Sequence, residues 1–211
     1  MSRPGACAYG TASWVLLAIL VPARAWPAPV LLEPVCFGVE RLDPVYENAG
    51  LDSRLTTRLG LGAAVELGSR LTLACDLGRA TSHADFGLLG NSGARLERSD
   101  ANLELRWQAP GRFFGWSLQP ALGAGRLRLA CRPQSLNLEA GGTTFVVSLH
   151  PVSEWTRHLA AEVLHPVSGR GQVVLRVSCR FYGLDVATPA GSRREDIRDV
   201  QAGASLRVAV F

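Results

Sequence analysis

Apolar and polar residues alternate with a period of two through most of the chain. Over the fourteen residues 54–67, leucine, valine, alanine or threonine occupies every odd position, while arginine, glycine, threonine, alanine or glutamate occupies every even one. Successive side chains of a strand point to opposite faces, so this pattern predicts a strand with one apolar and one polar face. At ~3.3 Å per residue and a tilt of ~45°, such a strand spans roughly 33 Å, close to the thickness of a bilayer core.

The same alternation predicts eight strands and an all-β chain, because helical periodicity never persists for more than a turn. The strands are expected near 35–42, 54–67, 70–79, 100–108, 112–129, 154–165, 171–183 and 199–211. Within 112–129 the apolar positions change phase through Gly123-Ala124-Gly125. This change predicts a bulge or a glycine kink in that strand.

Short and long connectors alternate between these strands. The short ones are Gly68-Ser69, Ala109-Pro110-Gly111 and 165–170, and the long ones are 43–53, 80–99, 130–153 and 184–198. All tight turns therefore lie at one end of the predicted sheet and all long loops at the other. This arrangement is typical of outer-membrane barrels with short periplasmic turns and long extracellular loops.

In this pattern residues 35–211 resemble the small eight-stranded outer-membrane β-barrels of OmpA, OmpX and OmpW type, within the porin-like superfamily. The last strand, VQAGASLRVAVF, ends on Phe211, as strands recognised by the outer-membrane assembly machinery usually do. The resemblance implies an eight-stranded antiparallel up-and-down transmembrane barrel in the outer membrane of a Gram-negative bacterium. It also implies contact with outer-membrane lipids and lipopolysaccharide, assembly by that machinery, a monomeric state, and no nucleic acid or cofactor.

The first 25 residues have the three parts of a cleaved signal peptide. Arg3 precedes an apolar stretch from Trp14 to Val21, and Ala23-Arg24-Ala25 forms a small-residue cleavage site. The expected organisation is a signal peptide at 1–25, a short lead at 26–34 and the barrel at 35–211. All 22 basic residues are arginine, and removing Arg3 and Arg24 leaves 20 against 18 acidic residues. Such a nearly neutral chain has no basic face typical of nucleic-acid binding.

Alternation alone also fits a secreted soluble barrel of lipocalin type, with its apolar face inside. Lipid outside is favoured because the polar faces carry small residues and arginine in place of the Lys and Glu of a soluble surface. The aromatic residues also fall at two heights, as membrane interfaces select. The expected interface aromatics are Trp107, Trp116, Trp155, Phe181 and Tyr182.

With this orientation the charged residues of the polar faces point into the lumen. They are Arg54, Arg58, Glu66, Arg70, Asp76, Glu104, Arg106, Arg176 and Arg180. Isolated buried charges are costly, so these side chains must pair or stay hydrated. The sequence therefore predicts an ion-paired plug, with a polar path for a small solute as the alternative.

Signals for catalysis or metal binding are weak. Ser153, His158 and Glu162 supply the residue types of a hydrolase, but their spacing is not diagnostic. His83 and Asp85 offer only two metal-ligand types in a loop. We therefore expect a non-enzymatic barrel for envelope structure, surface interaction or restricted solute passage, without catalytic, cofactor or metal site. The alternatives are a lipid-modifying enzyme of the lipid A deacylase kind and the secreted soluble barrel.

Five cysteines occur, and Cys7 is expected to leave with the signal peptide. The predicted strand order places Cys75 and Cys179 on opposite sides of the barrel, with Cys36 and Cys131 at different ends. A disulfide needs Cα atoms within ~7 Å, so all four are predicted to be free thiols.

Overall fold

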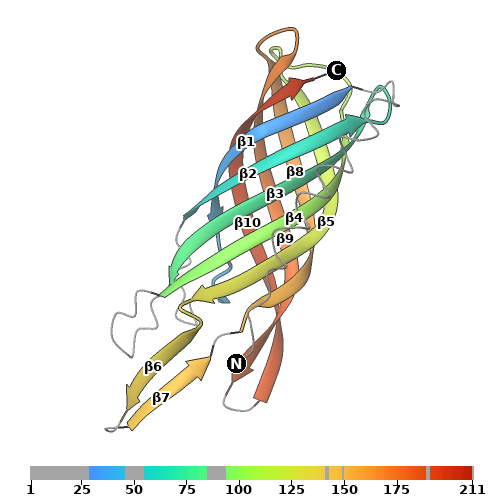
Figure 1. The fold of residues 1–211 in the computed structure, drawn as a ribbon. Helices are drawn as coiled ribbons and strands as arrows, with labels where there is room; N and C mark the ends of the chain where they lie inside the picture. The colour runs from blue at the N-terminus through green and yellow to red at the C-terminus, as the bar shows by residue number, and fades with distance from the viewer. Residues whose placement is uncertain are drawn as a thin grey trace.

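The computed structural model describes residues 29–45, 55–84, 94–140, 143–148, 150–188 and 191–210. Eight strands form a closed barrel, and two short strands form a separate hairpin (Figure 1). The barrel strands are β1 (Val30–Arg41), β2 (Thr56–Glu66), β3 (Leu71–Ala84), β4 (Ala94–Trp107), β5 (Ser117–Arg132), β8 (Val152–Pro166), β9 (Gly171–Thr188) and β10 (Gly191–Ala209); the hairpin strands are β6 (Ser135–Ala140) and β7 (Thr143–Ser148). Among the described residues, no helix has the length and apolar character needed to cross a membrane.

Each barrel strand pairs antiparallel with its neighbours in the chain, and β1 closes the barrel against β10. The predicted eight-stranded antiparallel up-and-down barrel is thereby confirmed. The turns after β2, β4 and β8 lie together at what we call the short-turn end, at the top of Figure 1. The opposite end is called the long-connection end. The expected signal peptide at 1–25 and the assembly signal at Phe211 lie outside the described residues.

Strand pairing extends further toward the long-connection end than the sequence pattern predicts. β3 and β4 approach each other so that only 85–93 connect them, and β6 and β7 form a hairpin within 130–153. The expected loop at 184–198 is wrong, since β9 and β10 pair as far as Thr188 and Gly191. In the extensions of β4 and β10 the apolar side chains Leu96 and Ile197 point inward, opposite to the outward apolar face of the same strands, so the alternation changes phase while backbone pairing continues.

The bulge predicted near the middle of the fifth strand is also wrong. β5 pairs with β4 in a single register over 121–132. Gly123 and Gly125 face the interior, where a Cβ atom would collide with the side chains of His158 and Asn102 respectively. These glycines make room for two inward side chains, and no extra residue is inserted into the pairing of β5 with β4.

The phase change in β5 reflects a change of surroundings along an unbroken strand. Near the short-turn end Leu122 points outward and is exposed. Nearer the long-connection end Leu127 and Leu129 are buried inside, while Arg126 and Arg128 point outward. The barrel thus has an apolar exterior over one part of its height and an apolar interior over another.

The register irregularity of the barrel lies in β1. Its pairing with β10 shifts between Leu32 and Cys36, and the pairing with β2 shifts at the same place. Pro34 lies inside the shift and has no N–H to donate to a ladder, as is common at bulges. The extra residue inverts the parity of the strand, so Glu33 before it and Glu40 after it are both buried. It also hides the start of β1 from the alternation, which is why the barrel begins at Val30 and not at 35.

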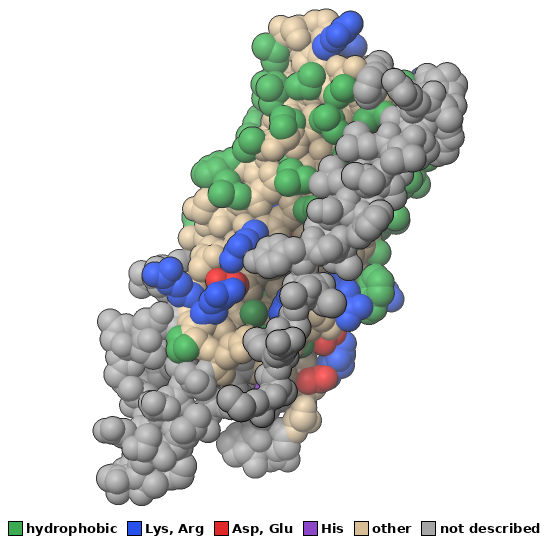
Figure 2. Space-filling view, in the orientation of Figure 1, with side chains coloured by type: hydrophobic (Ala, Val, Ile, Leu, Met, Phe, Trp, Pro, Cys, Tyr) green, Lys and Arg blue, Asp and Glu red, His purple; other side chains and the backbone are tan. Residues whose placement is uncertain are grey.

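Apolar side chains form two separate groups. One is a band on the outside wall, visible in green over the upper part of the barrel in Figure 2. The other is a cluster inside the barrel toward the long-connection end, which we call the apolar plug. It consists of Leu42, Leu96, Leu127, Leu129, Tyr182 and Ile197.

Leu127→Ala and Arg128→Ala test this assignment of faces on neighbouring residues. Leu127 is fully buried in the apolar plug, so its truncation should lower the free energy of unfolding by about 2–5 kcal/mol. Arg128 is exposed, and its truncation should change that free energy by no more than about 0.5 kcal/mol. Urea unfolding of the detergent-solubilised barrel measures both. A larger loss for Arg128→Ala than for Leu127→Ala would show that the two faces are exchanged, as the predicted bulge would require.

The four described cysteines are free thiols, and Cys75 on β3 and Cys179 on β9 lie on strands separated by three others in either direction around the barrel. Alkylation of the denatured protein without reductant should therefore modify Cys36, Cys75, Cys131 and Cys179. Mass spectrometry of the peptides reads the result, and a pair of these sites that reacts only after reduction would contradict the strand order.

Candidate functional site

Two neutral clusters of charged residues fill the interior of the barrel between the apolar plug and the short-turn end. The proximal cluster, nearer the short-turn end, consists of Glu33, Glu104, Glu162, Arg106, Arg176 and Arg207. The distal cluster, nearer the plug, consists of Glu40, Asp76, Asp100, Arg58, Arg98 and Arg180. Each combines three carboxylates with three guanidinium groups.

Glu104 is the centre of the proximal cluster. Its carboxylate accepts from Nε of Arg106 at 3.0 Å and from Nη1 of Arg176 at 2.7 Å. Arg106 reaches Glu33 at 2.6 Å, and Arg176 reaches Glu162 at 2.9 Å. Both arginines thus bridge two carboxylates from different strands, with charge-assisted bonds that are stronger than neutral ones.

Arg207, from β10, completes the cluster. Its guanidinium reaches Glu33 at 2.8 Å and Glu162 at 2.7 Å, and Nη1 donates to the side-chain oxygen of Gln119 at 2.9 Å. Ser205 donates to the second oxygen of Glu33 at 3.0 Å. These bonds join β1, β5, β8 and β10 across the interior.

The distal cluster has the same design. Arg58 lies 2.8 Å from Asp76 and 2.5 Å from Asp100. Arg180 joins Asp100 at 3.1 Å to Glu40 at 3.4 Å. A chain of alternating charges therefore runs from Asp76 on β3 through β2, β4 and β9 to Glu40 on β1.

Neutral side chains complete the distal cluster. Arg98 pairs with Glu40 at 3.2 Å and donates to the Ser82 hydroxyl at 3.3 Å. Gln201 donates to Glu40 at 2.9 Å, and Asn102 donates to Asp100 at 2.7 Å. Buried charges keep their low energy only when such additional bonds satisfy them.

Two glycines give inward polar side chains their space. A Cβ atom at Gly78 would collide with the guanidinium of Arg58, and one at Gly123 would collide with the imidazole of His158. His158 in turn lies with Nε2 at 2.7 Å from Glu104. These positions need a residue without a side chain because the lumen is narrow.

Little open space remains inside the barrel. A cavity of about 50 Å³ lies between the two clusters, bordered by Arg58, Asp76, Arg106 and Arg176 among others. This volume suits a few water molecules. Toward the long-connection end the apolar plug covers the distal cluster, and Tyr182 donates from the plug to Asp199 at 2.8 Å.

The structure places most of the sequence-predicted lumen residues in these clusters. Six take part, namely Arg58, Asp76, Glu104, Arg106, Arg176 and Arg180. Glu66 is half-buried at the short-turn end of β2. Arg70 is exposed in the turn before β3 and is not a lumen residue, because the strand begins only at Leu71. Arg54 lies outside the described residues.

Sequence reasoning missed the other half of the clusters. The alternation of the strands could have identified four of them. Arg98 and Asp100 lie an even number of positions from Glu104 on β4, and Glu162 and Arg207 lie on the face opposite the apolar positions of β8 and β10. No such signal exists for Glu33, because the bulge in β1 inverts the parity there.

The predicted aromatic residues do not all face outward. Trp107 and Phe181 are exposed on the outside wall, and Trp155 is 71% exposed. Trp116 is half-buried in the turn before β5 and stacks against His165. Tyr182 is the exception: it is buried in the apolar plug, because it is the inward neighbour of outward Phe181.

The candidate hydrolase residues do not meet. His158 and Glu162 point into the lumen, where Glu104 and the arginines bind them, while Ser153 is exposed on the other face of the same strand. The expected metal ligand Asp85 and the side chain of His83 lie outside the described part of the structure. Within that part, no group of three His, Cys, Asp or Glu residues is arranged to hold a metal ion.

Glu104→Gln and Glu97→Gln compare two ion-paired glutamates of β4. Neutralising buried Glu104 leaves Arg106 and Arg176 with uncompensated charge, so it should lower the free energy of unfolding by about 3–5 kcal/mol. Glu97 pairs on the outside wall with exposed Arg79 and Arg132, and its loss should cost at most about 1 kcal/mol. Urea unfolding measures both variants, and equal effects would contradict a stabilising role of the clusters.

No protein-family model and no curated protein matches the sequence. Among solved structures it is similar to Neisserial surface protein A, with a TM-score of 0.49, 12% identity, and coverage of 86% of this chain and 96% of that one. It is also similar to Ail, the attachment invasion locus protein of Yersinia pestis (TM-score 0.47, 13% identity, coverage 85% and 97%), and to the outer membrane protein OprG from Pseudomonas aeruginosa (0.47, 9%, 87% and 96%). At these identities the similarity is one of fold alone.

Proposed function

We propose that the protein is a non-enzymatic outer-membrane barrel that is closed to solutes and serves the structure of the cell envelope. The observation that carries the proposal is the combination of an apolar outside wall with a charged, ion-paired interior. In a soluble barrel these two surfaces exchange places. A wall of this kind is stable only where lipid replaces water around it.

The height of the outside band supports insertion in a bilayer. On β4 the outward positions from Trp107 back to Ala101 are apolar, and Ser99 and Glu97 follow. On β10 they are apolar from Val208 back to Val200, and Arg198 follows. Export with the short turns on the periplasmic side, as in barrels of this architecture, leaves the long-connection end and the β6–β7 hairpin at the cell surface.

The interior supports a plug and not a channel. An eight-stranded barrel is just wide enough for its own side chains. Here twelve charged residues in two neutral clusters fill it, and the apolar plug lies between them and the long-connection end. A solute would have to break several charge-assisted bonds at once, so a closed barrel is proposed in preference to a path for a small solute.

Nothing in the described side chains favours the hydrolase alternative. The residues that would act as nucleophile and base lie on opposite faces of β8, and His158 is bound to Glu104. We therefore propose that outer-membrane lipids, including lipopolysaccharide, surround a monomeric barrel without modification by it. The assembly machinery of the outer membrane is its proposed partner during insertion. An unchanged mass-spectrometric profile of lipid A after deletion of the gene is the expected result.

Single-channel recording in a planar bilayer tests the closed barrel. The folded protein should show no steady conductance, because the two ion clusters and the apolar plug block the lumen. Heat-modifiable migration in gels, in which the unboiled barrel runs differently from the boiled chain, verifies that the sample is folded. A large and steady conductance from folded protein would refute the plug and support a solute path.

A further inference from the structure

Arginine is the first charged outward residue beyond the apolar band on five of the eight barrel strands. Followed from the short-turn end, the outward apolar positions of β1, β3, β5, β8 and β10 each end at an arginine. We call these residues the arginine girdle: Arg41, Arg79, Arg126, Arg157 and Arg198. Figure 2 shows basic side chains gathered below the hydrophobic band of the visible face.

These outward arginines differ from the inward ones in their partners. Each arginine of the two interior clusters meets at least one carboxylate. Within the described residues, Arg126, Arg157 and Arg198 form no ion pair with a carboxylate. Arg126 lies over the ring of Trp155 at 5.7 Å, and Arg198 lies over the ring of Phe181 at 5.9 Å. Aromatic rings thus position the guanidinium groups of Arg126 and Arg198, and Nε of Arg198 also donates to Sγ of Cys179 at 3.2 Å. Without a carboxylate partner, these arginines keep donors for a ligand from outside.

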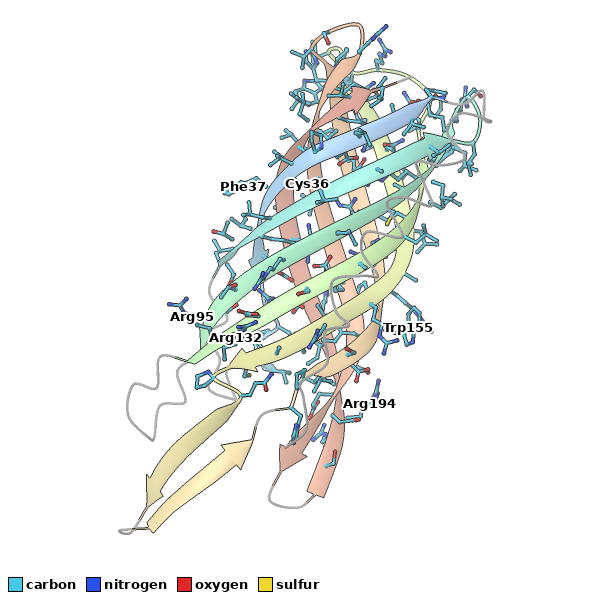
Figure 3. The ribbon with its side chains drawn as sticks, in the orientation of Figure 1. Cys36, Phe37, Arg95, Arg132, Trp155 and Arg194 are labelled. Carbon is cyan, nitrogen blue, oxygen red and sulfur yellow. The ribbon has the colours of Figure 1, made fainter. Side chains whose placement is uncertain are left out.

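A groove of about 640 Å³ lies on the outer face of β8, β9 and β10 and is lined by Trp155, Arg157, Phe181 and Arg198 among others. Gly183 faces outward opposite Asp196 on β10, and the guanidinium of Arg194 lies over it, in the space that a Cβ atom would take. Arg157 and Arg198 border the groove beside the apolar band. Arg194 borders it on the far side, where it makes long contacts of 3.4 Å to Asp185 and Glu154. Trp155 and Arg194 mark this face in Figure 3.

The geometry points to a binding site in this groove for the phosphate group of a lipid headgroup in the outer leaflet. The inference rests on the proposed membrane insertion and adds a partner to it. Arg194 is paired with Asp185 and Glu154, but Arg157 and Arg198 outnumber the remaining lining carboxylate, Asp196, and leave the groove positive beside the apolar band. The guanidinium fork matches a phosphate group with paired hydrogen bonds. Leu159 and Val177 continue the apolar wall from the groove toward the short-turn end, so an acyl chain can lie on the wall while its headgroup enters the groove. Free phosphate lacks this second contact.

Native mass spectrometry of the detergent-solubilised barrel, titrated with diphosphorylated lipid A, tests the site. The wild type should bind, and Arg157→Ala/Arg198→Ala should bind at least about tenfold more weakly because two charge-assisted contacts are lost. Arg112→Ala/Arg170→Ala is the matched control: it removes the same charge from exposed turns at the short-turn end and should bind like the wild type. Equal binding by the groove variant and the wild type would overturn the proposal.

A second variant fills the groove without changing its charge. Gly183→Leu places a side chain where the flexible end of Arg194 now lies, so it pushes that end into the groove and should likewise reduce the affinity at least several-fold. Gel migration of unboiled samples shows whether each variant is folded. Unreduced affinity in folded Gly183→Leu would refute the groove as the site.

Two further ligands separate the possible sources of phosphate. Lipid A from which both phosphates have been removed should bind at least about tenfold more weakly to the wild type, and equal binding would show that phosphate is not recognised. Inorganic phosphate should not displace diphosphorylated lipid A at equal concentration. If it does, the groove is a site for free anions and the lipid assignment fails. None of these outcomes depends on conductance, so failure of this site and failure of the closed barrel are distinguishable.

Discussion

Neutralisation of charge inside a narrow wall is the constraint on which the structure depends. Eight strands enclose a lumen with space for side chains and little else, and a lone charge there would cost several kcal/mol. The chain meets this constraint with two clusters of three carboxylates and three arginines each. Because five of the six guanidinium groups bridge carboxylates from different strands, the clusters tie the barrel across its interior as well as fill it.

Several features of the backbone follow from that requirement. The bulge in β1 turns Glu33 inward, where Arg106 and Arg207 need a third carboxylate beside Glu104 and Glu162. Gly78 and Gly123 remain without side chains because Arg58 and His158 occupy the space that a Cβ atom would take. Register and glycine positions are therefore parts of the same solution as the ion pairs.

The polarity of the wall inverts along the strands, and this inversion divides the barrel into two environments. Between the short-turn end and the arginine girdle, leucine and valine point outward and charges point inward. Between the girdle and the long-connection end, Leu127, Leu129 and Ile197 point inward and arginines point outward. The first arrangement suits lipid and the second suits water, as in a soluble barrel. Arginine serves both: it pairs with carboxylates inside, and outside it lies over the rings of Trp155 or Phe181.

The sequence by itself determined the fold class, the number of strands, the ends at which short turns lie, and the inward face of β2, β3, β4 and β9. These properties depend on local alternation, which is written in consecutive residues. The pairing of charges was decided only by the tertiary structure, because Glu33 meets Arg207 across 174 positions of sequence and a bulge hides its parity. The extent of β9 and β10 beyond the apolar band, the unbroken register of β5 and the inward Tyr182 were likewise decided there. In each case the backbone ladder and the narrow lumen, and not the alternation of apolar residues, set the position of the side chain.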